Sequence, residues 1–320
     1  MNICKRFFRF LLILSLLFSF FALFSCTYEK KQTAEESIVF HDALGRQVSA
    51  PKNPKRVAAL LGSFADIWML AGGDLCAASE DAWEDFGFEG DAVNLGGAHS
   101  PSLELLLSAD PDLVLASSST ASNVEMREAL ESMGITVVYF EVLTFEDYLH
   151  MLDFCTDLTG RKDLYEANGT ALCAQIEAVK ADYESRELTE KERKVLVLRV
   201  SSGKVKAKGS RGTVLGEMLS DMGCVNIADN DQNLLENLSI EAVIREEPYH
   251  IFAVAMGDDL ASAADSLDRL IRENPAWASL DAVKCDRVHM MDKTLFNLKP
   301  NDRFAEAYEK LYEVLTEEKN

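Results

Sequence analysis

The stretch PSLELLLSADPDLVLA (residues 101–116) has the same residue pattern as the stretch LSIEAVIREEPYHIFA (residues 238–253). Each contains a serine, an aliphatic residue, a glutamate, a variable position, two aliphatic residues, three spacers and a proline, followed by an aliphatic run. The pattern is typical of a short helix that serine caps, with glutamate in the first turn, and of a strand that begins after the proline. The two glutamates, Glu104 and Glu241, are 137 residues apart, about the size of one domain. The repeat therefore predicts two similar halves.

Short aliphatic runs alternate with amphipathic stretches on both sides of the chain's middle. Strands are expected at RVAAL (56–60), LCAAS (75–79), AVNLGG (92–97), DLVLASS (112–118), ITVVYF (135–140), KVLVLRV (194–200), HIFAVAMG (250–257) and RVHMM (287–291). One helix is expected to start at Ser63 as its N-cap, and others to span residues 121–133, 144–160, 212–223 and 303–315. This alternation predicts mostly parallel sheets with helices on both faces.

The segment between the two series has no strand signal. Residues 163–186 are predicted to form one helix of about 36 Å, at 1.5 Å per residue, although Gly169 within it is unfavourable. A single helix of this length makes a stiff joint between two small domains. We therefore predict an N-terminal α/β lobe at residues 38–160, an inter-lobe helix at 161–190 and a C-terminal α/β lobe at 191–320.

The N-terminus has the features of an export signal. A basic MNICKRFFRF is followed by an apolar run that is shorter than the ~20 residues of a membrane-spanning helix. The run ends in LFSC, which resembles a bacterial lipobox with Cys26 as the lipidated residue. We predict a signal peptide at residues 1–25 and a lipidated tether at 26–37, which would hold an exported protein on the outer face of the cytoplasmic membrane or in the periplasm. The alternative is an uncleaved anchor helix.

The charge distribution points to an anionic ligand and away from nucleic acid. The chain has a formal net charge of −21, which repels polynucleotides and makes local positive sites unusual. The stretch RVSSGKVKAKGSRG (199–212) contains five basic residues and no acid, and LFNLKPNDRF (295–304) adds Lys299 and Arg303. Lysines at 206 and 208 fit a charged face of an edge strand, where their role is either edge protection or part of an anion site.

Taken together, the lipobox, the two repeated phrases and the joining helix resemble the substrate-binding lipoproteins of ABC importers for iron-siderophore, haem and cobalamin. The similarity extends from FHDALGRQVSAPKNPKRVAAL (40–60) through GEMLSDMGCVNIAD (216–229) to ENPAWASLDAVKCDRVHMMD (273–292). It implies the class III periplasmic-binding-protein fold: two Rossmann-like α/β lobes joined by a single long helix, with the ligand in a cleft between them. It also implies that Glu104 and Glu241, one on each lobe, dock onto arginines of the permease.

Ligands of parallel sheets bind beyond the C-terminal ends of the strands, which selects a set of loops in each lobe. The expected ligand-binding residues are Ser63, Phe64, Trp83, His99, Arg199, Lys206, Lys208, Met256, Phe296, Lys299 and Arg303. Several of these residues are basic, and ferric siderophore complexes are often anionic. A ferric siderophore is therefore the expected cargo. Haem, with His99 or Met256 as an axial ligand, and cobalamin are the alternatives.

Other classes of protein have less support in the sequence. It has no G-x-G-x-x-G, Walker A, G-x-S-x-G or H-E-x-x-H motif, so we expect no catalytic residues, no cofactor and no metal bound directly by side chains. A non-transport surface lipoprotein would not need two matched lobes with basic loops. The expected partners are a metal chelate, an importer permease and the membrane through the lipid anchor, with the protein itself a monomer.

Overall fold

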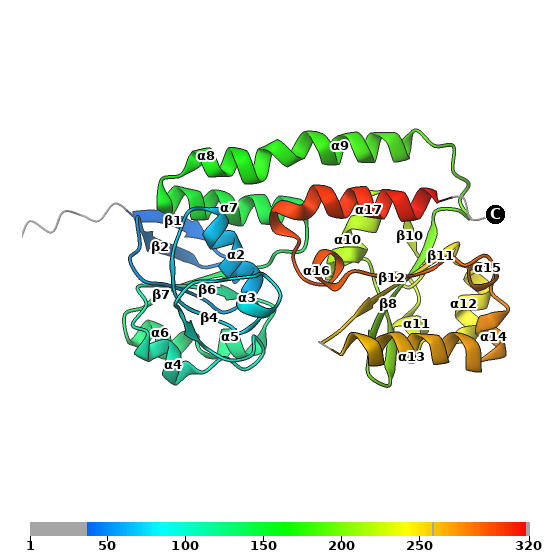
Figure 1. Ribbon diagram of the computed structural model, residues 1–320, viewed down its shortest axis with the longest axis horizontal. Helices are drawn as coiled ribbons and strands as arrows, with labels where there is room; N and C mark the ends of the chain where they lie inside the picture. Colours follow the sequence, from blue (N-terminus) through cyan, green and yellow to red (C-terminus); the bar gives the residue numbers. More distant parts are fainter. Residues whose placement is uncertain (1–36, 258, 318–320) are drawn as a thin grey trace, which may run out of the picture. The chain divides into compact units, whose positions relative to one another are not determined.

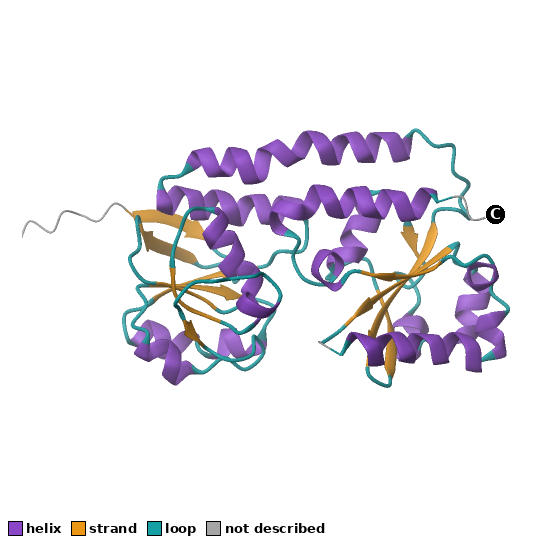
Figure 2. Cartoon of the chain, in the orientation of Figure 1, coloured by secondary structure: helices purple, strands orange, loops and turns teal. Residues whose placement is uncertain are grey.

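The computed structural model describes residues 37–257 and 259–317 (Figures 1 and 2). The predicted signal peptide, Cys26 and all of the predicted tether except residue 37 lie outside this range. The described residues from 38 onward form one compact unit. We use "first half" for residues 38–160 and "second half" for residues 191–317. No helix within the described ranges combines the length and the apolar character needed to cross a bilayer.

The first half is built on a parallel sheet with the strand order β5-β4-β3-β6-β7. Its strands are β3 (Val57–Ala59), β4 (Leu75–Ala78), β5 (Val93–Asn94), β6 (Leu113–Ser117) and β7 (Thr136–Phe140). All residues of β6 are buried, and they alternate between two cores: Leu113 and Leu115 face one cluster, Val114 and Ala116 the other. This alternation explains why the predicted strand is a continuous apolar run, since helices cover both faces of the sheet.

The helices of the first half connect and cover these strands. They are α2 (Gly62–Leu70), α3 (Asp81–Glu84), α4 (Leu103–Ser108), α5 (Ala121–Glu125), α6 (Arg127–Ser132) and α7 (Phe145–Thr159). Two expectations need correction: α2 begins at Gly62 without a cap from Ser63, and the helix expected over residues 121–133 is divided at Met126. The end of α7 agrees with the sequence, because Gly160 adopts the left-handed φ of 73° that terminates helices.

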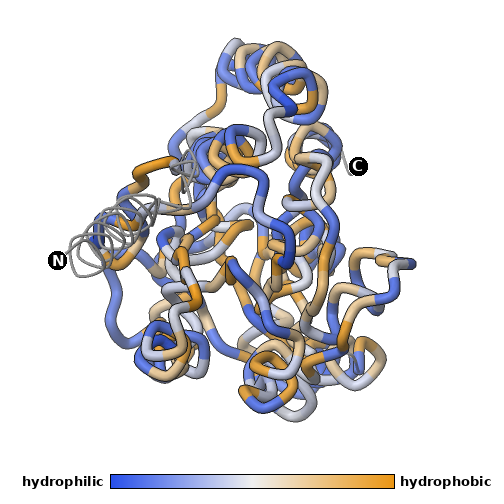
Figure 3. The backbone as a smooth tube through the Cα atoms, turned by 90° about the vertical axis from the view of Figure 1, so that its left-hand side faces the viewer, coloured by the Kyte–Doolittle hydropathy of each residue, from blue (hydrophilic) through white to orange (hydrophobic). Residues whose placement is uncertain are grey.

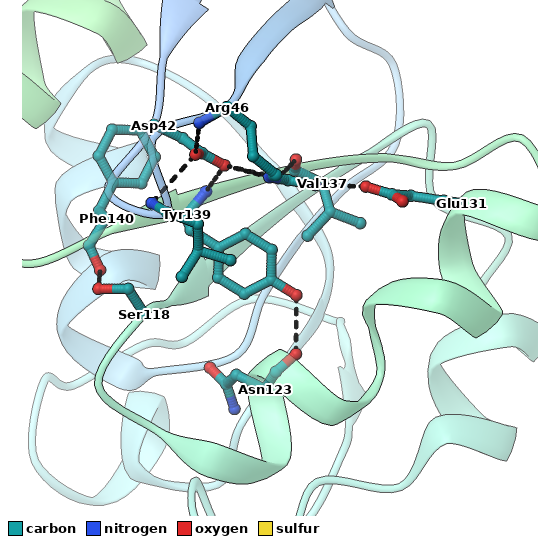
Figure 4. A network of polar contacts seen from close by, with 9 residues as sticks. Asp42, Arg46, Ser118, Asn123, Glu131, Val137, Tyr139 and Phe140 are labelled. Atoms are coloured by element: carbon teal, nitrogen blue, oxygen red, sulfur yellow. Dashed lines mark hydrogen bonds and ion pairs between the residues drawn. The ribbon is translucent and has the colours of Figure 1, made fainter.

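A hairpin near the start of the described chain was not predicted. It consists of β1 (Ser37–His41) and β2 (Gln47–Pro51). The turn between them is fixed to the first sheet through Asp42, which accepts hydrogen bonds from the side chain of Arg46 and from the backbone N–H of Tyr139 (Figure 4). Arg46 also donates to the carbonyl of Val137, and the Tyr139 hydroxyl donates to the carbonyl of Asn123. The hairpin is therefore joined to β7 by buried polar contacts.

The second half repeats this plan, with the strand order β10-β8-β11-β12 and one antiparallel addition, β9 on β8. Its strands are β8 (Lys194–Ser201), β9 (Lys204–Lys208), β10 (Val225–Asn226), β11 (His250–Ala255) and β12 (Val288–Met291). Its helices are α10 (Val214–Asp221), α11 (Gln232–Asn237), α12 (Ile240–Glu246), α13 (Leu260–Glu273), α14 (Pro275–Ala278), α15 (Asp281–Lys284), α16 (Lys293–Phe296), η2 (Asn301–Arg303) and α17 (Phe304–Thr316). Figure 3, which views the molecule from the side of the first half, shows hydrophobic and hydrophilic residues mixed along the helices, as expected for helices that bury one face.

The repeated phrase occupies the same place in both halves. Ser102 accepts a hydrogen bond from the N–H of Leu105 and caps α4, and Ser239 accepts one from the N–H of Ala242 and caps α12. The strands that follow, β6 and β11, each lie beside the first strand of their own parallel sheet, β3 and β8. The prediction of two similar halves is confirmed.

The segment between the halves is helical but not regular. It comprises α8 (Lys162–Tyr165), a π-helical turn η1 (Glu166–Thr170) and α9 (Ala171–Glu184). At Gly169 an added Cβ would lie 2.9 Å from a methyl of Leu149, so the close approach to α7 requires glycine. Near this turn the carbonyl of Asn168 accepts a hydrogen bond from the Tyr148 hydroxyl at 2.7 Å. The lobe boundaries at residues 160 and 190 stay a prediction.

Candidate functional site

A cavity of about 540 Å³ lies where the loops of the two halves meet. The loops that follow β3, β6 and β11, and the end of β8, all contribute to it. Examples are Leu61 and Ser63 after β3, Ser119 and Thr120 after β6, Arg199 near the end of β8, and Met256 and Gly257 after β11. In each sheet these strands flank the point where the strand order reverses, which is where parallel sheets bind ligands.

Two cations of the second half face this cavity and have no carboxylate partner among the residues that the structure describes. Arg199 and Lys299 are half-buried, and neither forms a hydrogen bond or an ion pair with another side chain within residues 37–257 and 259–317. Burial lowers the pKa of Arg199. Burial also lowers the pKa of Lys299, as does the positive charge of Arg199, while Asp81 and Glu141 act in the opposite direction. A charge that is partly removed from water raises the free energy of the protein unless an opposite charge lies nearby. This wall of the cavity therefore suits an anion.

The opposite wall is acidic, and the sequence reasoning did not foresee this. Glu80, Asp81, Glu84 and Asp85, on and next to α3, all line the cavity. The basic groups that the sequence suggested therefore form only one side of the cavity. A signal was present, because the predicted strand LCAAS (75–79) is followed directly by EDAWED (80–85), which contains four acidic residues. The acidic groups all come from the first half and the basic groups from the second.

Hydrogen bonds and one ion pair hold this acidic wall in place. Asp81 accepts a hydrogen bond from the N–H of Gly62 through Oδ2 at 2.8 Å, which connects α3 to the start of α2. Asp85 is 3.1 Å from the ammonium of Lys293, which comes from α16 in the second half. The positive charge of Lys293 is thus already compensated, unlike the charges of Arg199 and Lys299.

Five of the predicted ligand-binding residues line the cavity together: Ser63, His99, Arg199, Met256 and Lys299. The predicted aromatic contacts do not. Phe64 is fully buried in the core and packs edge-on against Phe140, and Phe296 is a core residue at 2% exposure. Trp83 is half-buried against Phe88 rather than turned into the cavity. In each case an adjacent residue in the sequence, Ser63, Asn297 or Glu84, lines the cavity instead.

Three predicted basic residues also lie outside the cavity lining. Lys206 is exposed and Lys208 half-buried on β9, where Lys206 is paired in register with Arg199. The pKa of Lys208 is lowered by burial and by the nearby charges of Arg199 and Lys206. Lys206 and Lys208 therefore add positive electrostatic potential next to the cavity, although neither lines it. Arg303 forms an ion pair with Glu306 at 2.7 Å and does not line the cavity.

Glu104 and Glu241 are both exposed in the first turns of α4 and α12. Glu241 accepts a hydrogen bond from the Ser239 hydroxyl at 2.9 Å, and its backbone N–H and this hydroxyl lower the pKa of the carboxyl. Their role in docking stays a prediction. Within the described residues no group of three or more histidine, cysteine or acidic side chains is arranged to hold a metal ion.

A half-buried carboxyl lies behind the cavity, where the two halves touch. Asn301, from the second half, donates through Nδ2 to the carbonyl of Ser63 at 2.9 Å and to Oδ2 of Asp66 at 2.7 Å. Burial raises the pKa of Asp66 to about 6, against the opposing effect of the Asn301 hydrogen bond. Ionised Asp66 is therefore unfavourable in the folded protein.

We expect Asp66→Asn to stabilise the protein at pH 8 and to have little effect at pH 4. Because the pKa of the folded state is raised above its unfolded value near 3.8, the contribution of Asp66 to stability is complete below pH 4 and is lost as the pH rises through 6. The gain in the free energy of unfolding from Asp66→Asn at pH 8, relative to pH 4, is on the order of 2–3 kcal/mol. Urea unfolding of both proteins at the two pH values measures it, with Asp268→Asn on the surface of α13 as the control. An equal effect at both pH values would contradict the assignment.

Comparison with known proteins agrees with this geometry. A family model described as "Periplasmic binding protein" matches residues 32–295. The uncharacterized ABC transporter substrate-binding lipoprotein YvrC of Bacillus subtilis is 22% identical over 288 residues, covering 89% of this chain and 88% of its own. The Fe(3+)-citrate-binding protein YfmC of the same organism is 23% identical over 269 residues, covering 82% and 81%.

The fold is also found in solved structures. That of the petrobactin-binding protein YclQ from Bacillus subtilis superimposes with a TM-score of 0.69 at 19% identity, covering 88% of this chain and 100% of the other. The likeness confirms the predicted fold of two α/β lobes with a long connecting helix. Since the family model spans well over half of the sequence, the chain belongs to the periplasmic binding protein family.

Proposed function

We propose that the protein is the substrate-binding component of an ABC importer and that it carries an anionic metal chelate, a ferric siderophore or ferric carboxylate complex, in the cavity between its halves. The observation that carries the proposal is the pair of cations, Arg199 and Lys299, that face the cavity and have no carboxylate partner within the described part of the chain. An anionic ligand supplies the missing charge, and the guanidinium offers paired donors to carboxylate or catecholate oxygens. The relative named as an Fe(3+)-citrate-binding protein is consistent with such a cargo.

Haem is the second candidate, because His99 and Met256 both line the cavity and belong to residue types that bind haem iron. The remaining lining favours a polar chelate. Hydroxyl and charged side chains make up about half of the lining residues, and Phe86 is the one phenyl ring among the described ones. A flat macrocycle needs wider apolar walls than this. We assign no catalytic residue, in keeping with a family of binding proteins.

The lipid anchor and the export route belong to the same proposal. Cys26 is the proposed attachment site, and the relative YvrC is named as a lipoprotein. The protein would then act on the outer side of the cytoplasmic membrane, where cargo is transferred to a permease.

Titration of the intrinsic fluorescence tests the cargo. The probes are ferric citrate, a ferric catecholate, a ferric hydroxamate, their iron-free forms, haemin and cyanocobalamin. We expect at least one ferric complex to bind in the micromolar range or tighter, and its iron-free form at least tenfold more weakly. Binding of haemin alone would favour the second candidate, and binding of none of the ferric complexes would remove the proposal.

Charge reversal at the two exposed glutamates tests the proposed docking to a permease. We expect Glu104→Lys and Glu241→Lys each to reduce uptake of radioactive iron by cells about tenfold, because complementary charges speed and orient docking. The affinity for cargo should stay within about twofold, since neither residue lines the cavity. The matched control is Glu309→Lys on the exposed side of α17. Normal uptake by the double variant would contradict a docking role.

A further inference from the structure

Residues 293–301, which we call the strap, belong to the second half but are attached to the first half at both ends. The strap consists of α16 (Lys293–Phe296) and the loop that ends at Asn301. At its start the ammonium of Lys293 lies 3.1 and 3.3 Å from the two carboxylate oxygens of Asp85 in the first half. The two side chains are only 12% and 18% exposed, so water screens this ion pair less than one on the surface.

The other end is attached through Asn301, whose side chain is fully buried against α2 of the first half. It donates hydrogen bonds to the carbonyl of Ser63 and to the carboxylate of Asp66. Asn301 also has a φ of 55°, a left-handed conformation that few residues other than glycine adopt. Asparagine adopts this conformation more readily than most residues, and the two hydrogen bonds fix its side chain on the first half.

The middle of the strap lines the cavity. Asn297, Leu298 and Lys299 all contribute to the lining, and the N–H groups of Asn297 and Leu298 donate back to the carbonyl of Lys293. Lys299 is two residues from the Asn301 attachment. Its ammonium has no partner of its own among the described residues, so nothing in its immediate contacts fixes it in the cavity. Its location follows from the attachments of the strap.

We infer that Asn301 and the Lys293–Asp85 ion pair are positioning residues, which hold Lys299 in the cavity against the anionic group of the cargo. The inference rests on the proposed function in that it takes the cargo to be an anion. A charge held in place before binding costs less conformational entropy when the ligand arrives. The attachments lie on the first half while Lys299 belongs to the second, so cargo affinity becomes dependent on the contact between the halves.

Hydrogen exchange tests the strap without any ligand. Asn301→Gly removes the two hydrogen bonds while glycine accepts the left-handed backbone, and Asp85→Asn removes the ion pair from the opposite side. We expect each variant to speed amide exchange in the peptide spanning 293–301 about tenfold. Arg245→Gln, which breaks surface ion pairs with Asp231 and Glu246 elsewhere, should leave that peptide unchanged. Unaltered exchange in both strap variants would overturn the inference, whatever the cargo.

A double-mutant cycle separates positioning from a general structural role. The probe is ferric citrate, or the ferric complex among those above that binds the unaltered protein. We expect Asn301→Gly to weaken binding about tenfold and Lys299→Gln about 100-fold, with the double variant no weaker than Lys299→Gln alone. Additive losses would overturn the inference, because Asn301 would then act independently of Lys299. Failure of every ferric complex to bind the unaltered protein would overturn the proposed function and leave the exchange experiment to decide the strap.

Discussion

We expect glutamine in place of Arg199 to weaken the binding of an anionic ferric chelate by about 100-fold and, in the same protein, to raise the melting temperature of the empty form. The loss of affinity follows from the proposed role of the guanidinium as the partner of the anion, since truncating such a partner costs about 2–5 kcal/mol. The gain in stability follows because burial already penalises this charge, which no carboxylate of the described chain neutralises. Isothermal titration with a ferric complex and thermal unfolding without it measure the two effects.

The matched control is Arg303→Gln. Both residues are arginines that the sequence suggested for the site, but Arg303 lies outside the cavity lining and forms an ion pair with Glu306. We expect its removal to change affinity by less than about threefold and to leave the empty protein no more stable, since an exposed ion pair contributes about 0–1 kcal/mol. Equal effects of the two substitutions would show that only the overall charge matters. A fall in the melting temperature of empty Arg199→Gln would contradict the idea that its charge awaits a ligand.

Alanine at Gly62 is expected to lower the free energy of unfolding by about 3 kcal/mol and to weaken cargo binding at the same time. An added Cβ would lie 2.6 Å from both the N of Ala82 and the carbonyl carbon of Asp81. These are backbone atoms, so α3 must move away, and overpacking of this kind is costly. The movement breaks the hydrogen bond from the Gly62 N–H to Asp81 and displaces the acidic wall of the cavity.

Gly97→Ala provides the comparison. Gly97 also lines the cavity, but a Cβ built there has no neighbour within 4 Å and its backbone needs no left-handed conformation. We expect a change of less than about 0.5 kcal/mol in the free energy of unfolding and a small change in affinity. Urea unfolding and the ferric titration apply to both variants. Equal tolerance of alanine at the two positions would show that α2 and α3 are not as closely packed as the contacts indicate.

Much of the fold was readable because its elements depend on local pattern. The serine caps of α4 and α12, the glycine that ends α7 and the apolar runs of β6 and β11 follow from chain chemistry within a few residues. The strand pair β1 and β2 was missed because its residues alternate only partly and its stability depends on Asp42 and Tyr139, which are far apart in the sequence. The π turn in the connecting helix likewise depends on the close approach of Gly169 to α7.

The site was readable only in part. The rule that ligands lie beyond strand ends selected the right loops, and Ser63, His99, Arg199, Met256 and Lys299 line the cavity. It did not separate neighbours on the same helix or strand, so Phe64, Phe296 and Trp83 were predicted as ligand contacts although they pack in or against the core. Successive side chains along a helix point about 100° apart. An error of one residue in the predicted start of a helix therefore changes which side chain is expected to face the cavity.

By itself, the sequence determined the two-fold repetition of the βα units, the helical connection between them and the loops from which a site could be built, since these depend on periodicity and capping. Tertiary structure alone decided the rest. It brought Arg199 and Lys299 to one cavity, placed Asp81 and its acidic neighbours opposite them, and attached the strap to the first half through Asn301. These arrangements join residues about 100 to 240 positions apart, and such contacts depend on how the two sheets and their helices pack, which no local pattern specifies.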